Sequence, residues 1–137
     1  MSEHVGRASV DRASVDRWVA GYLAAWRAPG TESLGTLFTP EATYLASPWA
    51  TPVAGRSALA AFWDDERDGP DEDFTFTHEV AAVDPEARTA VVRAEVAYAR
   101  PSSGPWRDLW VVRFADDGRC AAFEEWPFAP DQPDGHG

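Results

Sequence analysis

The sequence predicts an α+β domain in which three N-terminal helices cover one face of an antiparallel sheet. Before Pro70, apolar residues recur with the spacing of helix faces. After Pro70, apolar and polar residues alternate, which is the period of a half-buried strand. Helices therefore come first in the chain, and a meander of strands follows them.

The first predicted helix has the clearest periodicity. Its apolar residues occur at i, i+3, i+4, i+7, i+8 and i+11 and form one wide stripe, made of Val15, Trp18, Val19, Tyr22, Leu23 and Trp26. The segment Ala28-Pro29-Gly30 ends this helix, because proline and glycine favour helix termination.

A short duplication precedes the helix, since residues 7–11 (Arg-Ala-Ser-Val-Asp) recur as residues 12–16. Five residues at about 100° each rotate Val10 away from the apolar stripe. We therefore expect residues 1–13 to be an extra helical turn or a flexible lead-in that adds little core. Residues 14–128 are expected to form a single domain, and the Pro/Gly/Asp-rich tail 129–137 to be disordered.

Two shorter helices are predicted next. Leu34, Leu37 and Phe38 form the buried face of the second, which Pro40 stops, and an extended segment follows. A loop containing Pro48, Pro52 and Gly55 leads to the third helix, which Ser57 is expected to cap and Gly69-Pro70 to end. Its apolar face consists of Leu59, Phe62 and Trp63.

Four strands are predicted after Pro70. The first alternates Phe74, Phe76, His78 and Val80 with polar residues, and the second and third fall within residues 87–100 and 105–114. The turn at residues 116–118 (Asp-Asp-Gly) then leads into a last strand, residues 119–126.

Composition excludes several classes of function. The formal net charge of −11 and the pI near 4.5 argue against a nucleic-acid partner. The N-terminus lacks the apolar core of a signal peptide, and no apolar run approaches the ~20 residues of a membrane span, so a cytoplasmic protein is expected. Cys120 is the single cysteine, which leaves no intrachain disulfide. All 12 basic residues are arginine, a bias that suggests a GC-rich bacterial genome.

Over residues 14–128 the chain resembles the nuclear transport factor 2-like superfamily, in particular its SnoaL-like bacterial branch. The resemblance rests on the first helix, residues 37–44 (Leu-Phe-Thr-Pro-Glu-Ala-Thr-Tyr), the Pro/Gly loop, Phe62-Trp63, and residues 113–119 leading to Glu124-Glu125-Trp126. It implies a cone-shaped fold with a strongly curved sheet, a cavity between sheet and long helix, and frequent homodimers. Members include steroid isomerases, polyketide cyclases, dehydratases and epoxide hydrolases.

The catalytic residues of the steroid isomerases do not carry over. Those enzymes place a carboxylate base just before the loop proline, where this chain has Ala46-Ser47-Pro48. Trp18 aligns with their tyrosine donor, and Trp110 with their second acid and with the acid/base aspartate of SnoaL-like cyclases. Any proton transfer here must therefore use carboxyl groups from other positions.

Asp108 is the leading catalytic candidate, because alternation places it on the Trp110 side of its strand, which is expected to face the interior. A carboxyl group among tryptophans loses hydration, which raises its pKa and suits general acid/base work. The alternative is a structural aspartate that pairs with Arg107 or Arg100. Glu125 is the second candidate, and a bulge would exchange it with Glu124.

His78 is the third candidate, on the same strand face as Phe76 and Val80, and a register slip would exchange it with Glu79. The alternative is a core histidine with its hydrogen bonds satisfied. No residues have the spacing of a metal site, and the acidic run from Asp64 to Asp73 is expected to be a solvated helix end. No cofactor is expected.

Seven tryptophans are many for this length, and an aromatic cavity wall suits a flat or polycyclic apolar ligand. The expected binding residues are Trp18, Tyr22, Trp26, Tyr44, Trp49, Trp63, Tyr98 and Trp110. The alternative is that these rings fill the core.

Three functions follow from this reading. One is a cofactor-independent cyclase, isomerase or dehydratase that acts on an apolar, polyketide-like substrate. The others are a non-catalytic ligand-binding protein and a dimerising interaction module. A cavity with two or more carboxyl or imidazole groups favours the enzyme, an apolar cavity favours the binding protein, and a filled core favours the module.

Overall fold

The computed structural model describes residues 8–66, 74–98 and 105–132. Its helices are α1 (Arg12–Arg27), α2 (Leu34–Leu37) and α3 (Arg56–Glu66). The strands are β1 (Phe38–Leu45), β2 (Val53–Ala54), β3 (Phe74–Asp84), β4 (Thr89–Tyr98), β5 (Trp106–Phe114) and β6 (Cys120–Phe128). Arg100, most of the lead-in, the second half of the acidic run and the end of the tail lie outside the described residues.

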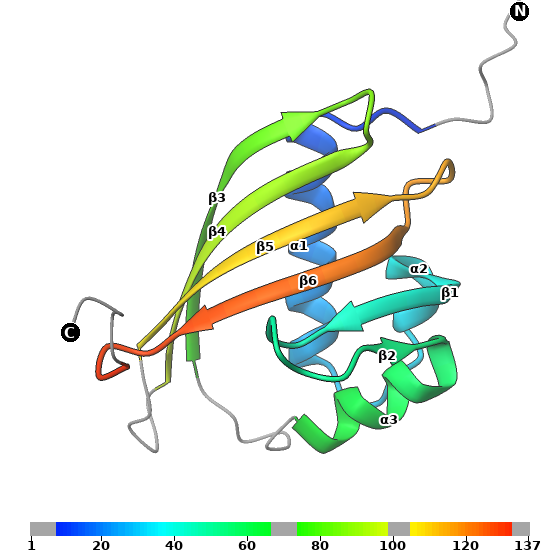
Figure 1. Cartoon of the computed structure of the whole chain (residues 1–137). Coiled ribbons are helices and arrows are strands. Elements are labelled where there is room, and N and C mark those ends of the chain that lie inside the picture. Colours follow the sequence, from blue (N-terminus) through cyan, green and yellow to red (C-terminus); the bar gives the residue numbers. More distant parts are fainter. Residues whose placement is uncertain (1–7, 67–73, 99–104, 133–137) are drawn as a thin grey trace, which may run out of the picture.

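The predicted α+β class is confirmed. One six-stranded sheet has the order β2-β1-β6-β5-β4-β3, and it bends around α1, which lies across its concave side (Figure 1). The meander β3-β4-β5-β6 is antiparallel as predicted, but β1 runs parallel to β6, with Tyr44 opposite Phe123. The chain can make this parallel pair because α3 and four strands separate β1 from β6.

Helix α1 begins at a capping box. The backbone N–H of Ser14 donates to Asp11 Oδ1 at 2.8 Å, and the backbone N–H of Asp11 donates to Ser14 Oγ at 2.9 Å. Because Asp11 is the cap, Val10 precedes the helix and does not follow the helical rotation. Val10 is buried in the core, so the expectation that the first copy of the duplication adds little core is wrong at this residue.

The second helix ends and the third begins at residues other than those predicted, and the predicted end of the third helix at Gly69-Pro70 lies outside the described residues. Leu37 ends α2, and Phe38 already belongs to β1, so the strand runs through Pro40. Helix α3 starts at Arg56, which places Ser57 inside its first turn. Gly55, with φ of 90°, takes the left-handed conformation just before the helix, which L side chains rarely adopt.

Aromatic rings dominate the core between α1 and the sheet. Trp18 donates its indole N–H to the Leu37 carbonyl at 3.0 Å and thereby ties α1 to the end of α2. Trp63 of α3 is fully buried, and Cys120, at the start of β6, is buried as well. Burial raises the pKa of the Cys120 thiol to about 12, as expected of an unreactive strand residue. Among the helices of the described ranges, none has the length and apolar character that crossing a membrane requires.

The capping box generates a test of helix α1. We expect Asp11→Ala to lower the free energy of unfolding by about 1 kcal/mol, because a backbone N–H at the first turn loses its acceptor. Asp11→Asn is the matched control and should stay within a few tenths of a kcal/mol of the wild type, since asparagine caps as well as aspartate. Urea unfolding followed by tryptophan fluorescence measures both, and equal stability of the alanine variant would contradict this role of Asp11.

Candidate functional site

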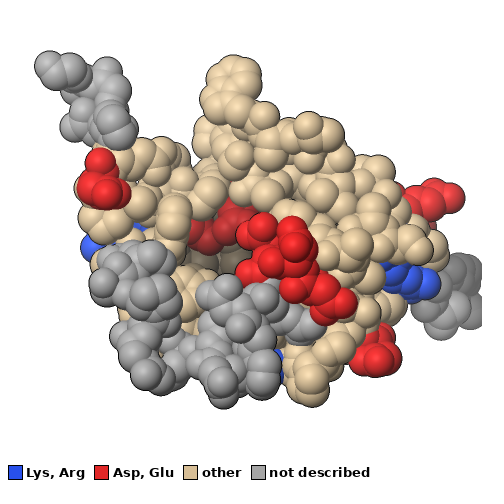
Figure 2. Space-filling view, turned by 90° about the horizontal axis from the view of Figure 1, so that it is seen from below, with Lys and Arg blue, Asp and Glu red and all other residues tan. Residues whose placement is uncertain are grey.

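A cavity of about 380 Å³ lies between the C-terminal half of α1, helix α3 and the inner face of the sheet. Figure 2 shows this face of the molecule hollowed, with acidic side chains inside the hollow and along one side of it. More than half of the residues that line the cavity are aromatic, and three are acidic, namely Glu66, Asp108 and Glu125. The site therefore combines apolar walls with a small set of carboxyl groups.

Five of the predicted binding residues line this cavity, and they come from four elements. They are Tyr22 and Trp26 of α1, Tyr44 of β1, Tyr98 of β4 and Trp110 of β5. Helical spacing places the first two on one face of α1, and strand alternation places the last two on the concave side of the sheet.

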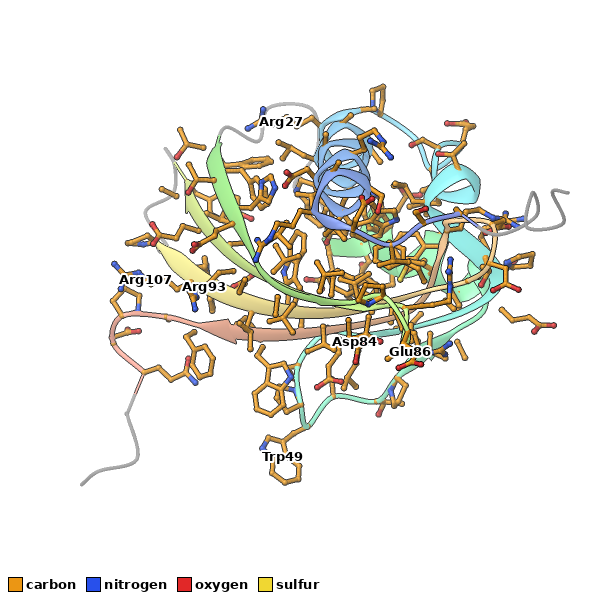
Figure 3. All side chains as sticks on the ribbon, turned by 90° about the horizontal axis from the view of Figure 1, so that it is seen from above. Arg27, Trp49, Asp84, Glu86, Arg93 and Arg107 are labelled. Carbon is orange, nitrogen blue, oxygen red and sulfur yellow. The ribbon has the colours of Figure 1, made fainter. Side chains whose placement is uncertain are left out.

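Three of the predicted binding residues lie elsewhere. Trp18 and Trp63 are buried in the core and do not line the cavity. Trp49 is 97% exposed in the loop after β1, and its side chain points away from the body of the protein (Figure 3). For Trp18 and Trp63 the core-filling alternative is correct, because a ring on an inward face is as easily packed as left open to a hollow.

Several lining residues were not predicted as site residues. Strand alternation could have identified three of them, because it places them on the inward side of β3 and β5: Phe74, Phe76 and Trp106. Phe62 of α3 was predicted only as core. Glu66 had no such pattern, because it ends α3 within a run of acids that resembles a solvated helix end.

Asp108 lies on the inner face of β5 and is only 7% exposed. Within the described part of the chain, its Oδ1 has no hydrogen-bond partner. Arg107, the neighbour considered as its partner, points outward and pairs with Glu95 of β4 at 3.5 Å (Figure 3). The alternative in which Asp108 is a structural residue paired with Arg107 is therefore wrong. Asp108 is a buried carboxyl group that faces a cavity.

Glu125 lies beside Asp108 on the same face of the sheet. The β5–β6 register pairs Trp110 with Glu125 and Asp108 with Pro127, so the two acids are diagonal neighbours across the strands. Glu124 takes the other face, where it accepts a hydrogen bond from the indole N–H of Trp126. Alternation thus assigned Glu125 and Glu124 to the correct faces.

The carboxyl groups of Asp108 and Glu125 are close enough for one to shift the pKa of the other. Burial, then hydrogen bonding with Asp108 and the charge of Asp108, raise the pKa of Glu125 well above its usual range, and the charge of Glu66 adds to the effect. When the pKa of one carboxyl group in a close pair is raised, that group is suited to donate a proton and its neighbour is suited to accept one. The pair therefore offers a candidate proton donor and a candidate proton acceptor side by side.

Two tyrosines form a second polar feature of the cavity. The hydroxyl groups of Tyr22 and Tyr44 lie 2.9 Å apart in a buried hydrogen bond. Burial is the main cause that raises the pKa of each phenol well above its usual range, so both are neutral hydrogen-bonding groups at ordinary pH. The indole N–H of Trp110 is also buried, and it finds no acceptor among the described residues.

His78 does not line the cavity. Its Nε2 lies 2.8 Å from Asp16 Oδ1, near the start of α1, and the ring stacks on Phe76 with centroids 6.1 Å apart. The prediction therefore placed His78 on the correct face of its strand, but His78 lies beyond the cavity along β3. A role for His78 as a base in the cavity is not supported. In the described ranges, no cluster of His, Cys, Asp or Glu has the geometry to hold a metal ion.

Comparison with known families places this site in context. The sequence profile of the SnoaL-like domain matches residues 19–123, which include all of the cavity-lining residues except Glu125 and Pro127. No match was found among curated proteins.

Solved structures with the same fold share little sequence with this chain. A protein from Jannaschia sp. CCS1, provisionally assigned as a SnoaL-like polyketide cyclase, has 18% identity and a TM-score of 0.67, covering 88% of this chain and 89% of its own. A steroid delta-isomerase from Pseudomonas aeruginosa has 16% identity and a TM-score of 0.62, covering 90% and 85%. SalBIII, an epoxide hydrolase/cyclase-like enzyme of pyran ring formation in salinomycin, has 13% identity and a TM-score of 0.67, covering 86% and 93%.

The raised pKa of Glu125 predicts how stability changes with pH. Between the ordinary glutamate pKa and the raised one, the folded state binds a proton that the unfolded state has lost, so stability falls as pH rises through this window. Glu125→Gln removes that proton, and we expect a shallower fall, with a difference of at most about 1.4 kcal/mol per pH unit. Urea unfolding at a series of pH values measures the slope.

Glu124→Gln is the matched control, because it removes the same charge one residue away on the opposite face of β6. Its slope should match the wild type. Identical slopes for Glu125→Gln and Glu124→Gln would contradict a proton held at Glu125.

Proposed function

The chain belongs to the SnoaL-like domain family, and we propose that it is a cofactor-independent enzyme of cyclase, isomerase or dehydratase type. It acts by general acid/base chemistry on an apolar, polyketide-like substrate held in the aromatic cavity. The observation that carries this proposal is the pair of carboxyl groups, Asp108 and Glu125, which are diagonal neighbours on β5 and β6 and both line that cavity.

The pair supports a simple division of roles. Asp108, whose Oδ1 has no protein partner in the described chain, accepts a proton from a carbon or hydroxyl group of the substrate. Glu125, whose pKa is raised well above its usual range, is the group suited to donate a proton to a substrate oxygen. Tyr22 and Tyr44 line the same cavity, and the hydroxyl hydrogen that their mutual hydrogen bond does not use is available to donate to a carbonyl group.

The relatives support the proposed class of reaction, but they do not support the choice of catalytic residues. Among similar structures are enzymes named for cyclase and isomerase activity, all below 20% identity. Ala46 lines the cavity in the segment where a steroid isomerase would hold its base, and Trp110 stands where the second acid is expected. The proposed proton transfer therefore comes from Asp108 and Glu125, on neighbouring strands β5 and β6.

A probe reaction tests this proposal without knowledge of the substrate. Ring opening of 5-nitrobenzisoxazole needs one base in an apolar pocket, because the base removes the C3 proton as the N–O bond breaks to give a coloured phenolate. We expect the wild type to accelerate it and Asp108→Asn to lose about 100-fold or more of that acceleration. Absorbance of the phenolate measures the rate, and thermal unfolding confirms that the variant folds.

Two further variants separate the roles. Glu125→Gln should keep most of the rate, since this leaving group needs no acid, and Glu124→Gln should match the wild type. Equal rates for the wild type and Asp108→Asn would overturn the enzyme proposal and favour a ligand-binding protein. A loss confined to Glu125→Gln would reverse the assigned roles.

A further inference from the structure

We propose that the cavity takes a ligand that carries an organic cation, an amine or quaternary ammonium group, on an aromatic or apolar frame. The cationic group lies among the aromatic rings, between Glu66 on α3 and the Asp108–Glu125 pair on the sheet. This inference rests on the proposed function in that it names the substrate class of the same cavity.

The first argument is that the carboxyl groups of the site have no basic partner in the described cavity wall. Three carboxyl groups line the cavity, and no basic residue does so among the described residues. Asp108 is more than nine-tenths buried, lines the cavity and has an Oδ1 without a partner in the part of the chain described. A buried carboxyl group that no protein donor satisfies is stabilised when a bound ligand supplies the donor or the charge.

The second argument is the aromatic wall. Tyr22, Trp26, Tyr98, Trp106 and Trp110 line the same space as the carboxyl groups. Aromatic faces attract cations, and quaternary ammonium groups are typically bound by several such rings. The ring of Phe74, another lining residue, already holds a cation in this way, with the Arg27 guanidinium carbon 4.5 Å from its centroid.

Other ligand charges fit the site less well. An anion would meet three acidic groups, and the described part of the cavity wall offers it no basic partner. A neutral apolar ligand would fill the space but leave the Asp108 Oδ1 without a partner. A cation satisfies both the carboxyl groups and the rings, so the cavity selects for positive charge.

Three unreactive compounds of one size test the selection. Benzyltrimethylammonium is the cation, neopentylbenzene its neutral isostere, and phenylmethanesulfonate an anion. Isothermal titration of the full chain should show the cation binding at least 10-fold more tightly than the isostere, and the sulfonate not binding. Neopentylbenzene binding as tightly as the cation would overturn the proposal.

A net charge of −11 attracts cations to the whole surface of the protein. Matched variants are therefore needed to show that the preference for the cation arises in the cavity. Glu66→Gln and Asp108→Asn should each reduce the preference for the cation several-fold, whereas Glu124→Gln, with the same loss of charge, should leave it unchanged. An unaltered preference in both cavity variants would refute a site in the cavity.

The compounds undergo no reaction, so this outcome is independent of turnover. If the cation shows no preference while Asp108→Asn still loses the ring-opening rate, the proposed enzyme stands and its substrate is neutral. If the preference holds while the rate is unaffected, the cavity is a cation-binding site and the enzyme proposal falls.

Discussion

The packing of Tyr22 decides where the core ends and the cavity begins. Its ring stacks on Phe123 of β6 with centroids 5.6 Å apart, and it meets Trp63 of α3 edge-on at 5.2 Å. Its hydroxyl group bonds to Tyr44, which also stacks on Phe123 at 4.6 Å. Tyr22 therefore joins the helix, both neighbouring strands and α3, and its far side forms part of the cavity wall. Beyond this cluster the described aromatic rings line a hollow instead of filling it.

The absence of basic residues from the described cavity wall reflects how the chain uses its arginines. Several donate to backbone carbonyl groups between elements: Arg56 to Phe38, Arg88 to Ala115 and Arg119 to Gly35, at 2.7–3.1 Å. These hydrogen bonds connect loops and helix ends to the sheet. The chain has no lysine that could supply a further positive charge. Burying carboxyl groups without a counter-charge costs stability. The protein carries that cost at a cavity, where a bound ligand can offset it.

How far the sequence predicts this arrangement depends on which interactions are local. Alternation along a strand fixed the faces of Asp108 and Glu125, because successive side chains point to opposite sides whatever the strand pairs with. Alternation could not predict where along β3 His78 lies relative to the cavity. That position depends on where α1 crosses the sheet, and the start of α1 brings Asp16 to His78. Helical rotation misplaced Val10, because Asp11 caps the helix, which starts at Arg12 and leaves Val10 outside it. The parallel β1–β6 pair joins segments about eighty residues apart, which no local pattern encodes.

A positively charged ligand group next to the carboxyl pair disfavours the protonated form of that pair. A cation beside Glu125 favours its ionised form and would release the proton that an acid/base reaction needs. Glu66 offers a way to separate the two, because it belongs to α3 and is exposed, whereas Asp108 is buried on the sheet. A ligand whose cationic group lies at Glu66 and whose reacting atoms lie at the pair leaves the proton in place. A ligand whose charge reaches the pair itself would be bound tightly and not turned over, so the position of the charge along the substrate decides between catalysis and binding.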